Sequence, residues 1–308
     1  MTEATAVVLQ EPERLTLSSV ELTPPSVDDV VVEVDFSGIS TGTERLLWSG
    51  RMPPFPGMGY PLVPGYESVG RVVQGNEHVE NGTTVFVPGS NGFVDVRGLF
   101  GGAASTLVVP SARVIPIASD LGEQGVLLAL AATAQHALGD SIPDLIVGHG
   151  VLGRLLARLA VARGGAPTVW ETDSSRLSGA EGYRAVLPES DAGNTYSTIV
   201  DVSGDVNVLD RLVGVLKRGG EIVLAGFYSE RVNFAFPPAF MKEARFRIAA
   251  EWQPNDLVSA HQRVVDGTLS LDGLITHRRA ASDANEAYRA AFTDPNCLKM
   301  LLDWRDLS

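Results

Sequence analysis

The chain has 308 residues, of which 44% are hydrophobic and 20% charged, a composition typical of globular proteins with a full core. This length favours two domains, and no apolar run approaches the length of a membrane-spanning helix. The formal net charge of −13 disfavours nucleic acid as a partner, because a negative field repels phosphate backbones.

Targeting signals and cysteines add two expectations. The N-terminus, Met1 to Gln10, lacks the basic start and apolar block of a signal peptide, which predicts a cytoplasmic protein without stable membrane insertion. The single cysteine, Cys297, forms no internal disulfide and lies in an apolar run, so it is expected to be a buried core residue. One cysteine also excludes a four-cysteine zinc site.

Residues 1–118 are predicted to form a β-rich domain. Short segments rich in β-branched residues are separated by Gly, Pro, Asn and Asp, which is the pattern of strands joined by turns. This spacing predicts a small, rolled all-β domain. The segments are TAVVLQ, DDVVVEVDF, GRVVQG, TTVFVP and STLVVPSARVIPI.

Residues 119–252 show a different pattern, in which short apolar strands alternate with longer helical stretches. Alternation of this kind predicts an α/β fold with a doubly wound parallel sheet, the Rossmann arrangement. Helices are expected at VLGRLLARLAVARGG and VNVLDRLVGVLKRGG, with a short helical stretch after the second strand. The expected strands are residues 145–147, 168–171, 198–204, 221–227 and 245–252.

Residues 253–308 mix helical and strand patterns. The segments LITHRRA and CLKMLLDW are predicted as short strands. This tail is too small to form a domain, so we expect it to pack back onto the first domain.

A glycine motif opens the first helix of the Rossmann unit. A G-x-G-x-x-G pattern alone is weak, but here a strand precedes it and a helix with apolar period follows. The first glycine allows the tight turn, the second lets the backbone approach a pyrophosphate, and the third lets the helix pack against the sheet. The predicted cofactor loop is Gly148, His149, Gly150, Val151, Leu152 and Gly153.

An acidic residue, Glu171, closes the next strand about twenty positions later, as the dinucleotide fingerprint requires. Its carboxylate is expected to accept hydrogen bonds from the adenosine ribose and to repel a 2′-phosphate, so NAD is preferred over NADP. Ser203, Gly204 and Gly226 follow later strands and are expected to line the nicotinamide. The alternative without a function is an ordinary βαβ turn that binds no ligand.

The order of a β-rich start, a Rossmann unit and a returning tail resembles the medium-chain alcohol dehydrogenases, with their GroES-like and Rossmann domains. VEVDFSGISTGTE and PLVPGYESVG resemble the segments that carry their first two zinc ligands. The family's cysteine is Ser40 here, its histidine is Tyr66, and the third ligand, near Ala129, is missing. Glu67 remains, but one carboxylate does not hold zinc, so no metal is expected.

Longer segments are similar to the hydroxyethyl bacteriochlorophyllide dehydrogenases of bacteriochlorophyll synthesis. They include STGTERLLWSGRMPPFPGMGYPLVPGYE, VRGLFGGAAS, FAFPPAFMKEAR and DPNCLKMLLDW, within residues 40 to 304. The resemblance implies NAD-dependent oxidation of a 3-(1-hydroxyethyl) group on a chlorin ring to an acetyl group. It implies a chlorin-type substrate, a bacteriochlorophyllide.

Without zinc, protein side chains must stabilise the alkoxide character that develops as the hydride leaves. Ser40 and Thr43 are candidates for a proton relay, although hydroxyl residues in Gly-rich turns are more often turn formers. Tyr66 is a candidate acid or base, held by Glu67, or else a wall of the site. His136 is a candidate titratable base, or else a core histidine.

A proline-stiffened loop is the candidate chlorin-binding face, because methionines and aromatic rings offer adaptable apolar contact. Its residues are Arg51, Met52, Phe55, Met58 and Tyr60. A second aromatic patch spans residues 234–241. Either patch is alternatively a subunit interface of a homodimer.

Two other functions stay open at this point. One is a zinc-free enzyme of the same fold that acts on another alcohol or on an enone. The other is a module that binds pigment or senses redox state and keeps NAD without turnover. The intact cofactor motif favours an enzyme.

Overall fold

A computed structural model describes residues 3–307, which divide into two compact units. One unit runs to Ala129 and resumes at Leu274, and the other comprises Leu130–Gly273. Residues 253–273, expected in the returning tail, thus belong to the second unit. Arg158, in the second unit, donates hydrogen bonds to the carbonyls of Ser270 and Asp272 at 2.8 and 2.9 Å. These bonds hold the end of this segment against the second unit.

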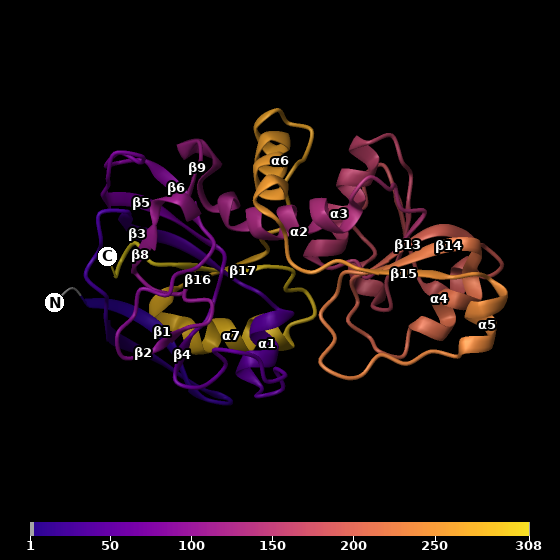
Figure 1. The fold of residues 1–308 in the computed structure, drawn as a ribbon, viewed down its shortest axis with the longest axis horizontal. Coiled ribbons are helices and arrows are strands. Elements are labelled where there is room, and N and C mark those ends of the chain that lie inside the picture. The colour runs from indigo at the N-terminus through magenta and orange to yellow at the C-terminus, as the bar shows by residue number, and fades with distance from the viewer. Residues whose placement is uncertain (1–2, 308) are drawn as a thin grey trace. The chain divides into compact units, whose positions relative to one another are not determined.

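The first unit contains two sheets (Figure 1). The smaller has the order β2-β1-β4-β7, and the larger has the order β16-β17-β3-β5-β6-β9 with β8 also paired to β3. The strands are β1 (Glu3–Glu11), β2 (Arg14–Glu21), β3 (Asp29–Ile39), β4 (Leu62–Val63), β5 (Ser68–Gln74), β6 (Thr84–Val87), β7 (Arg97–Gly98), β8 (Thr106–Pro110), β9 (Ile115–Pro116), β16 (His277–Ala280) and β17 (Met300–Asp303).

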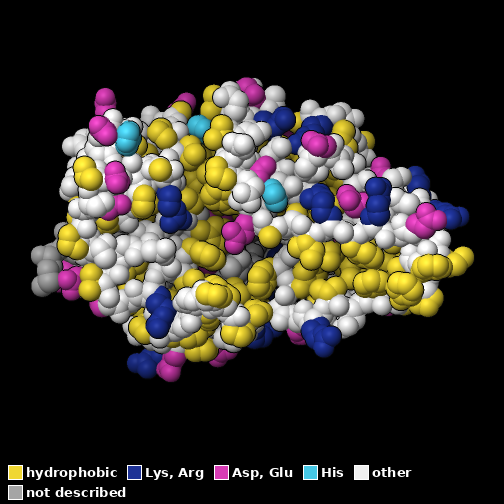
Figure 2. Space-filling view, in the orientation of Figure 1, with side chains coloured by type: hydrophobic (Ala, Val, Ile, Leu, Met, Phe, Trp, Pro, Cys, Tyr) yellow, Lys and Arg dark blue, Asp and Glu magenta, His cyan; other side chains and the backbone are white. Residues whose placement is uncertain are grey.

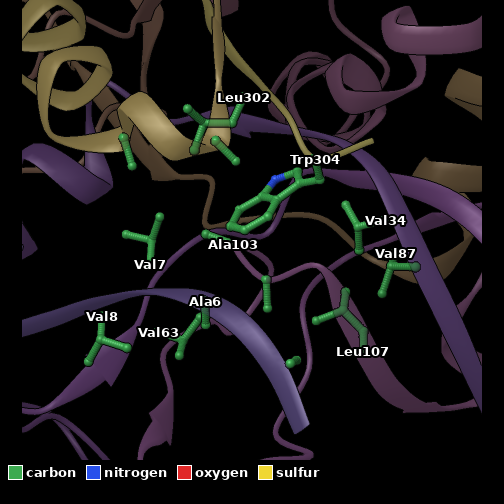
Figure 3. Packing of buried hydrophobic residues seen from close by; sticks show 14 of the residues in the cluster. Ala6, Val7, Val8, Val34, Val63, Val87, Ala103, Leu107, Leu302 and Trp304 are labelled. Carbon is green, nitrogen blue, oxygen red and sulfur yellow. The ribbon is translucent and has the colours of Figure 1, made fainter. Parts of the chain in front are cut away.

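The tail completes this unit. Strand β17 pairs antiparallel with β3, and helix α7 (Ala284–Thr293) packs below, as the yellow segment in Figure 1 shows. Trp304, just after β17, is fully buried and donates a hydrogen bond from Nε1 to Ser37 Oγ at 2.8 Å. Figure 3 shows its ring among Val34, Ala103 and other core residues. The aromatic tail residue therefore anchors the C-terminus in the first unit's core.

The second unit is a six-stranded parallel sheet with the order β12-β11-β10-β13-β14-β15. Counted along the chain from β10, this is the order 3-2-1-4-5-6 of the Rossmann fold. The strands are β10 (Leu145–Val147), β11 (Thr168–Trp170), β12 (Arg184–Val186), β13 (Tyr196–Asp201), β14 (Leu216–Leu224) and β15 (Arg245–Ile248).

The helices of both units bury apolar residues that recur at helical spacing. Helix α3 buries eight of its twelve residues, as expected for a helix that packs against the sheet. The helices are α1 (Thr43–Trp48), α2 (Leu128–Leu138), α3 (Val151–Ala162), α4 (Leu209–Val215), α5 (Phe236–Met241), α6 (Pro254–Val265) and α7, with short 3₁₀ turns between some elements. Within residues 3–307, no helix has the length and apolar character needed to cross a bilayer.

Two local predictions were wrong. The segment after β11 contains only a 3₁₀ turn (Ser174–Arg176), where a short helical stretch was expected. The segment LKRGG was expected to end a helix but starts strand β14 at Leu216, which pairs with Tyr196 of β13. Gly219 has a φ of +71°, and Gly219 and Gly220 both disfavour continuing helix α4.

Candidate functional site

The glycine motif lies between β10 and α3, at the carboxyl end of the sheet. Gly148 has a φ of +104°, which only glycine adopts without strain. A Cβ on Gly153 would lie 1.8 Å from the carbonyl oxygen of Gly148, so only glycine lets the helix approach the strand this closely. A Cβ on Gly150 would meet no described atom within 4 Å. The loop therefore packs closely against its own backbone at Gly148 and Gly153, and it has free space at Gly150.

The open side fits a pyrophosphate. Gly150 precedes α3 with no side-chain cap bond among the described atoms, so the first amides of α3 remain available to an anion. Loops from two other strands border the motif. A Cβ on Gly148 would lie 3.4 Å from the nitrogen of Ser203, and one on Gly226 would lie 3.0 Å from the nitrogen of Gly204. The structure thus brings all three predicted loops together at one sheet edge.

A buried carboxylate, Asp201, orders one of these loops. It accepts hydrogen bonds at its Oδ1 from the amide nitrogen and the hydroxyl of Ser203, at 3.0 and 2.7 Å. The hydroxyl of Tyr228 donates to its Oδ2. Burial raises the pKa of Asp201. This network, which the sequence analysis did not identify, fixes the position of Ser203.

Glu171, which is expected to accept hydrogen bonds from the adenosine ribose, also bonds to the cofactor loop and to its own turn. Its Oε2 accepts a hydrogen bond from the amide of His149 at 3.0 Å, and its Oε1 accepts from the amides of Thr172 and Asp173 at 2.8 and 2.9 Å. Only 9% of the residue is exposed. The hydroxyl of Thr172 also donates to Oε1, at 3.5 Å, so protein donors reach each of the about four acceptor positions of the carboxylate.

Both ring nitrogens of His149 have hydrogen-bond partners within the second unit. Its Nδ1 lies 2.6 Å from the carbonyl oxygen of Arg176, and its Nε2 lies 2.8 Å from the hydroxyl of Tyr183. Arg154 donates to the carbonyls of His149 and Arg176 at 3.1 and 3.0 Å. Burial lowers the pKa of His149 to about 4. The ring therefore stays neutral and is structural, and it is not directed at a ligand.

In the first unit, Ser40 and Tyr66 form a hydroxyl pair. The end of β3 and the turn before β5 bring Ser40 Oγ and Tyr66 Oη to 2.6 Å, and Thr43 Oγ1 lies 3.5 Å from the same phenol oxygen. Burial raises the pKa of Tyr66, so the phenol stays protonated. The three hydroxyl residues predicted from the former zinc-ligand segments thus lie together.

Glu67 was expected to hold Tyr66, and that expectation was wrong. Both of its carboxylate oxygens accept hydrogen bonds from Lys299 Nζ, at 2.9 and 2.6 Å, in a fully buried ion pair. Lys299 also donates to the carbonyl of Ile39 at 3.2 Å. Burial raises the pKa of Glu67, and Lys299 opposes that rise. A Cβ on Gly38 would overlap the Glu67 carboxylate at 2.3 Å, which explains the glycine there.

Two further residues of this cluster were missed from the sequence. Glu44, at the start of α1, accepts a hydrogen bond from the amide of Ser40 at 2.8 Å and another from the hydroxyl of Tyr288 at 2.6 Å. Tyr288 lies on α7, far along the chain. The bond to Ser40 could have been predicted, because an acidic residue four positions later is close enough to accept from its amide. The bond to Tyr288 could not, because no sequence pattern pairs these two residues.

His136 lies on α2 in the second unit. Its Nδ1 is 2.8 Å from Asp256 Oδ2, an oxygen that also accepts a bond from the amide of Gln253 at the start of α6. A carboxylate partner orients the imidazole ring. The pairing with Asp256 was not predicted.

The proposed substrate loop is partly exposed. Arg51 is exposed, whereas Phe55, Met58 and Tyr60 are half-buried. Met52 was expected on the substrate face, but it is 7% exposed and belongs to the core, so that assignment was wrong. Tyr60 donates a hydrogen bond from its hydroxyl to the carbonyl of Leu47, which ties the loop to α1.

Residues 3–307 contain no group of three or more His, Cys, Asp or Glu side chains placed to hold a metal ion. At the former zinc-ligand positions, the donors present are the hydroxyls of Ser40 and Tyr66, which are poor zinc ligands. The residues of this cluster do not fit the catalytic zinc of the alcohol dehydrogenase family.

Comparisons with known proteins agree with this architecture. Residues 26–119 match the alcohol dehydrogenase GroES-like domain family. The chain is 55% identical, over 99% of both chains, to 2-desacetyl-2-hydroxyethyl bacteriochlorophyllide A dehydrogenase of Rhodobacter capsulatus. It is 56% identical, over 98% of both chains, to the protein of the same name from Cereibacter sphaeroides.

Solved structures with lower identity show the same fold. An alcohol dehydrogenase from Escherichia coli CFT073, complexed with NADH, superposes with a TM-score of 0.83 at 22% identity, over 98% of this chain and 100% of that one. A zinc-binding dehydrogenase from Sinorhizobium meliloti 1021, bound to NADP, has a TM-score of 0.81 at 20% identity, over 98% and 100%. The chain therefore belongs to the family of 2-desacetyl-2-hydroxyethyl bacteriochlorophyllide A dehydrogenases within the medium-chain alcohol dehydrogenase superfamily, and it is an oxidoreductase.

Proposed function

We propose that this dehydrogenase oxidises the 3-(1-hydroxyethyl) group of a bacteriochlorophyllide to a 3-acetyl group, with NAD as hydride acceptor and without catalytic zinc. The substrate is proposed from the two relatives at 55% and 56% identity over nearly the whole chain. The observation that carries the cofactor is the open face at Gly150, between a tight glycine turn and the start of α3.

NAD is proposed over NADP because of the charge at Glu171. A carboxylate near the adenosine end disfavours a 2′-phosphate, and a ribose hydroxyl would replace the long bond that Thr172 Oγ1 donates at 3.5 Å. The loops at Ser203, Gly204 and Gly226 are proposed to line the nicotinamide, because ligands bind at the carboxyl ends of such sheets.

The hydroxyl proton must be handled by this chain's own groups. Bound NAD would supply the acceptor for the hydride of the carbinol carbon, and the proton of the hydroxyl would leave separately. We assign the substrate hydroxyl to the Ser40–Tyr66 pair, where the protonated phenol donates a hydrogen bond and stabilises developing alkoxide character. Thr43 is close enough to the phenol to extend this relay.

A final proton acceptor is also needed. His136 is the proposed base, since an imidazole oriented by Asp256 resembles the base and orienting partner of other acid–base sites. Glu67 is assigned an electrostatic role through Lys299, because its oxygens are already bonded.

The chlorin is proposed to lie against the loop that contains Arg51, Phe55, Met58 and Tyr60. Half-buried apolar side chains on a loop tied to α1 offer a face for a flat ring, and the exposed guanidinium of Arg51 is suited to a propionate.

A homodimer is proposed as well. Strand β15 is the edge of its sheet, and Phe246 and Ile248 on it are 36% and 78% exposed. Figure 2 shows a wide hydrophobic area in this region. A hollow of about 630 Å³ opens beside it, lined by Phe234, Phe236, Phe240, Met241 and Phe246 among others. An unpaired edge with exposed apolar side chains is suited to pairing with a second copy.

The test is direct. Purified protein is incubated with the hydroxyethyl pigment and either NAD or NADP, and the pigment and nicotinamide absorption bands are followed together. We expect a red shift of the pigment, because the new carbonyl conjugates with the ring, and an equal yield of NADH. Stoichiometric zinc in the active protein, or turnover only with other alcohols or enones, contradicts the corresponding part of the proposal.

A further inference from the structure

Strands β13 and β14 are neighbours in the parallel sheet, and each ends in a loop that is proposed to line the nicotinamide (Figure 1). The last residue of β13, Asp201, is fully buried and pairs in register with Leu224 at the end of β14. Asp201 therefore lies at the point where both loops begin.

Asp201 holds the loop after β14 with both its backbone and its side chain. Its carbonyl oxygen accepts hydrogen bonds from the amides of Ala225 and Gly226, at 2.9 and 3.0 Å. The hydroxyl of Tyr228, two residues further along, donates to Oδ2 of the same aspartate. This loop is thus fixed at its start and again at Tyr228.

The other carboxylate oxygen of Asp201 holds the loop after β13. Oδ1 accepts hydrogen bonds from the amide and the hydroxyl of Ser203, at 3.0 and 2.7 Å. Ser203 Oγ in turn accepts a bond from the amide of Asp205 at 3.2 Å, which orders the next turn. The carboxylate therefore bridges the two loops, with one oxygen bonded to each.

The backbones of the two loops also lie against each other. A Cβ on Gly226 would lie 3.0 Å from the nitrogen of Gly204, and a Cβ on Gly204 would lie 3.1 Å from the carbonyl oxygen of Phe227. Closely packed atoms leave no space to absorb a shift, so a displacement of one loop moves the other. The bond from Tyr228 to Asp201 is placed to hold both.

We propose that Tyr228 and Asp201 are positioning residues of the coenzyme site, whose phenol–carboxylate bond holds the loops after β13 and β14 in the arrangement that receives the nicotinamide end of NAD. This inference rests on the proposed function, which assigns these loops to the nicotinamide. In this role Tyr228 acts through Asp201 and does not touch the coenzyme. Loops that are ordered before binding lose less conformational entropy when the ligand arrives, so their order contributes to affinity.

A comparison of NAD with ADP-ribose tests this role, because ADP-ribose has the adenosine and both phosphates but lacks the nicotinamide ring. Calorimetry without pigment gives both dissociation constants. In Tyr228→Phe we expect the affinity for NAD to fall about tenfold, because loss of one hydrogen bond to a carboxylate releases both loops. The affinity for ADP-ribose should stay near the wild-type value, since the glycine motif and Glu171 are unchanged.

The chain offers a matched control at the opposite end of β13. Tyr196, the first residue of that strand, donates its phenol to the buried carboxylate of Asp191. Tyr196→Phe removes the same kind of bond from the same unit and should leave the ratio of the two dissociation constants at its wild-type value. An unchanged ratio in Tyr228→Phe overturns the inference, because a general loosening of the unit would weaken both ligands equally.

A double variant separates positioning from direct contact. Ser203→Ala removes the hydroxyl bond to the other oxygen of Asp201. If both residues act through this carboxylate, the combined loss of NAD affinity should be smaller than the product of the two single losses. A combined loss equal to that product shows independent action, and the role of Tyr228 through Asp201 is then wrong.

The two proposals fail in distinguishable ways. If the wild type binds NAD and oxidises the pigment while Tyr228→Phe keeps the wild-type ratio, the function stands and the role of Tyr228 is wrong. If the wild type binds NAD but leaves the pigment unchanged, the proposed substrate is wrong, and the ratio in Tyr228→Phe still decides the role of that residue. If the wild type binds neither nicotinamide coenzyme, the proposed function and this role both fall.

Discussion

Glu171 Oε2 accepts a hydrogen bond from the amide nitrogen of His149 at 3.0 Å, which ties the end of β11 to the glycine turn after β10. The residue expected to hold a ribose therefore also holds the loop expected to hold the pyrophosphate. Adenosine and pyrophosphate recognition should consequently respond together to changes at this carboxylate.

Replacing Glu171 with Ala removes the acceptor for three amides. Hydrogen bonds to a charged group contribute about 1.5–3 kcal/mol each, so loss of even one to the bound state weakens NAD binding about ten- to a hundredfold. Discrimination against NADP should shrink, because the negative charge is gone. Fluorescence titration with both coenzymes measures this. Wild-type NAD affinity in the variant would show that the loop does not need the carboxylate.

Two glycines of the cofactor loop should respond in opposite ways to substitution. Gly150→Ala places a methyl group in open space, so the fold should keep its stability while coenzyme binding weakens. Gly153→Ala places a methyl group 1.8 Å from a backbone oxygen, and such overpacking costs about 1–3 kcal/mol. Thermal melts and NAD titration of both variants separate the effects, and equal melting temperatures would contradict the close approach of α3.

Removing Lys299 should leave the buried carboxylate of Glu67 without its ion-pair partner. Lys299→Met leaves a carboxylate without its partner, which costs about 3–5 kcal/mol at neutral pH. The pKa of Glu67 then rises further, the folded state binds its proton more tightly than the unfolded state, and stability falls as pH increases. Denaturant unfolding at several pH values measures this. Arg14→Met, which removes an exposed ion pair with Glu11, is the control and should change stability little.

The neutral ring of His149 predicts acid sensitivity. Burial lowers its pKa to about 4, from an ordinary value of 6.5, so the unfolded chain takes up a proton before the folded one does. Its contribution to stability is therefore present above about pH 6.5 and is lost as pH falls towards 4. NMR titration should show a midpoint near 4 for this ring, and His149→Gln should flatten the loss of stability. A midpoint near 6.5 would contradict the buried contacts to Arg176 and Tyr183.

The proposed homodimer can be tested at its edge strand. Ile248→Asp places a charge on a side chain that is 78% exposed in the single chain and would be buried by pairing. Sedimentation should show a dimer for the wild type and a monomer for this variant. Val27→Asp, at an isolated residue that is 86% exposed, should remain dimeric. A monomeric wild type at all concentrations contradicts the proposal.

The extent of sequence-based prediction differs between the two units. Five of the six strands of the Rossmann sheet follow from apolar alternation, whereas β12 (Arg184–Val186) and the strand order were not predicted. The three glycine roles follow from their spacing around one turn. These are local properties, since each depends on residues within about twenty positions of one another. The short helical stretch after β11 was wrong, because long-range bonds to the ring of His149 and the side chain of Arg154 hold that segment in another conformation.

The charged cluster could not be predicted in the same way. Glu67 meets Lys299 and Glu44 meets Tyr288 across more than two hundred residues, and no local pattern encodes such pairings. Met52 looked like a surface residue in a proline-rich loop, yet its side chain fills a gap in the core.

By itself, the sequence determined most of the order of elements, the glycine loop and the hydroxyl residues in the segments that resemble zinc-ligand segments. Backbone preferences and apolar periodicity depend on residues close together in the chain, so they can be recognised from the sequence. Only the tertiary structure decided which buried charges are balanced. Lys299 has three donors and directs two of them to Glu67, and within residues 3–307 no ion pair reaches Glu44. That outcome depends on where β17 and α7 return to the first unit, and on the high free-energy cost of an unpaired charge in a dry interior.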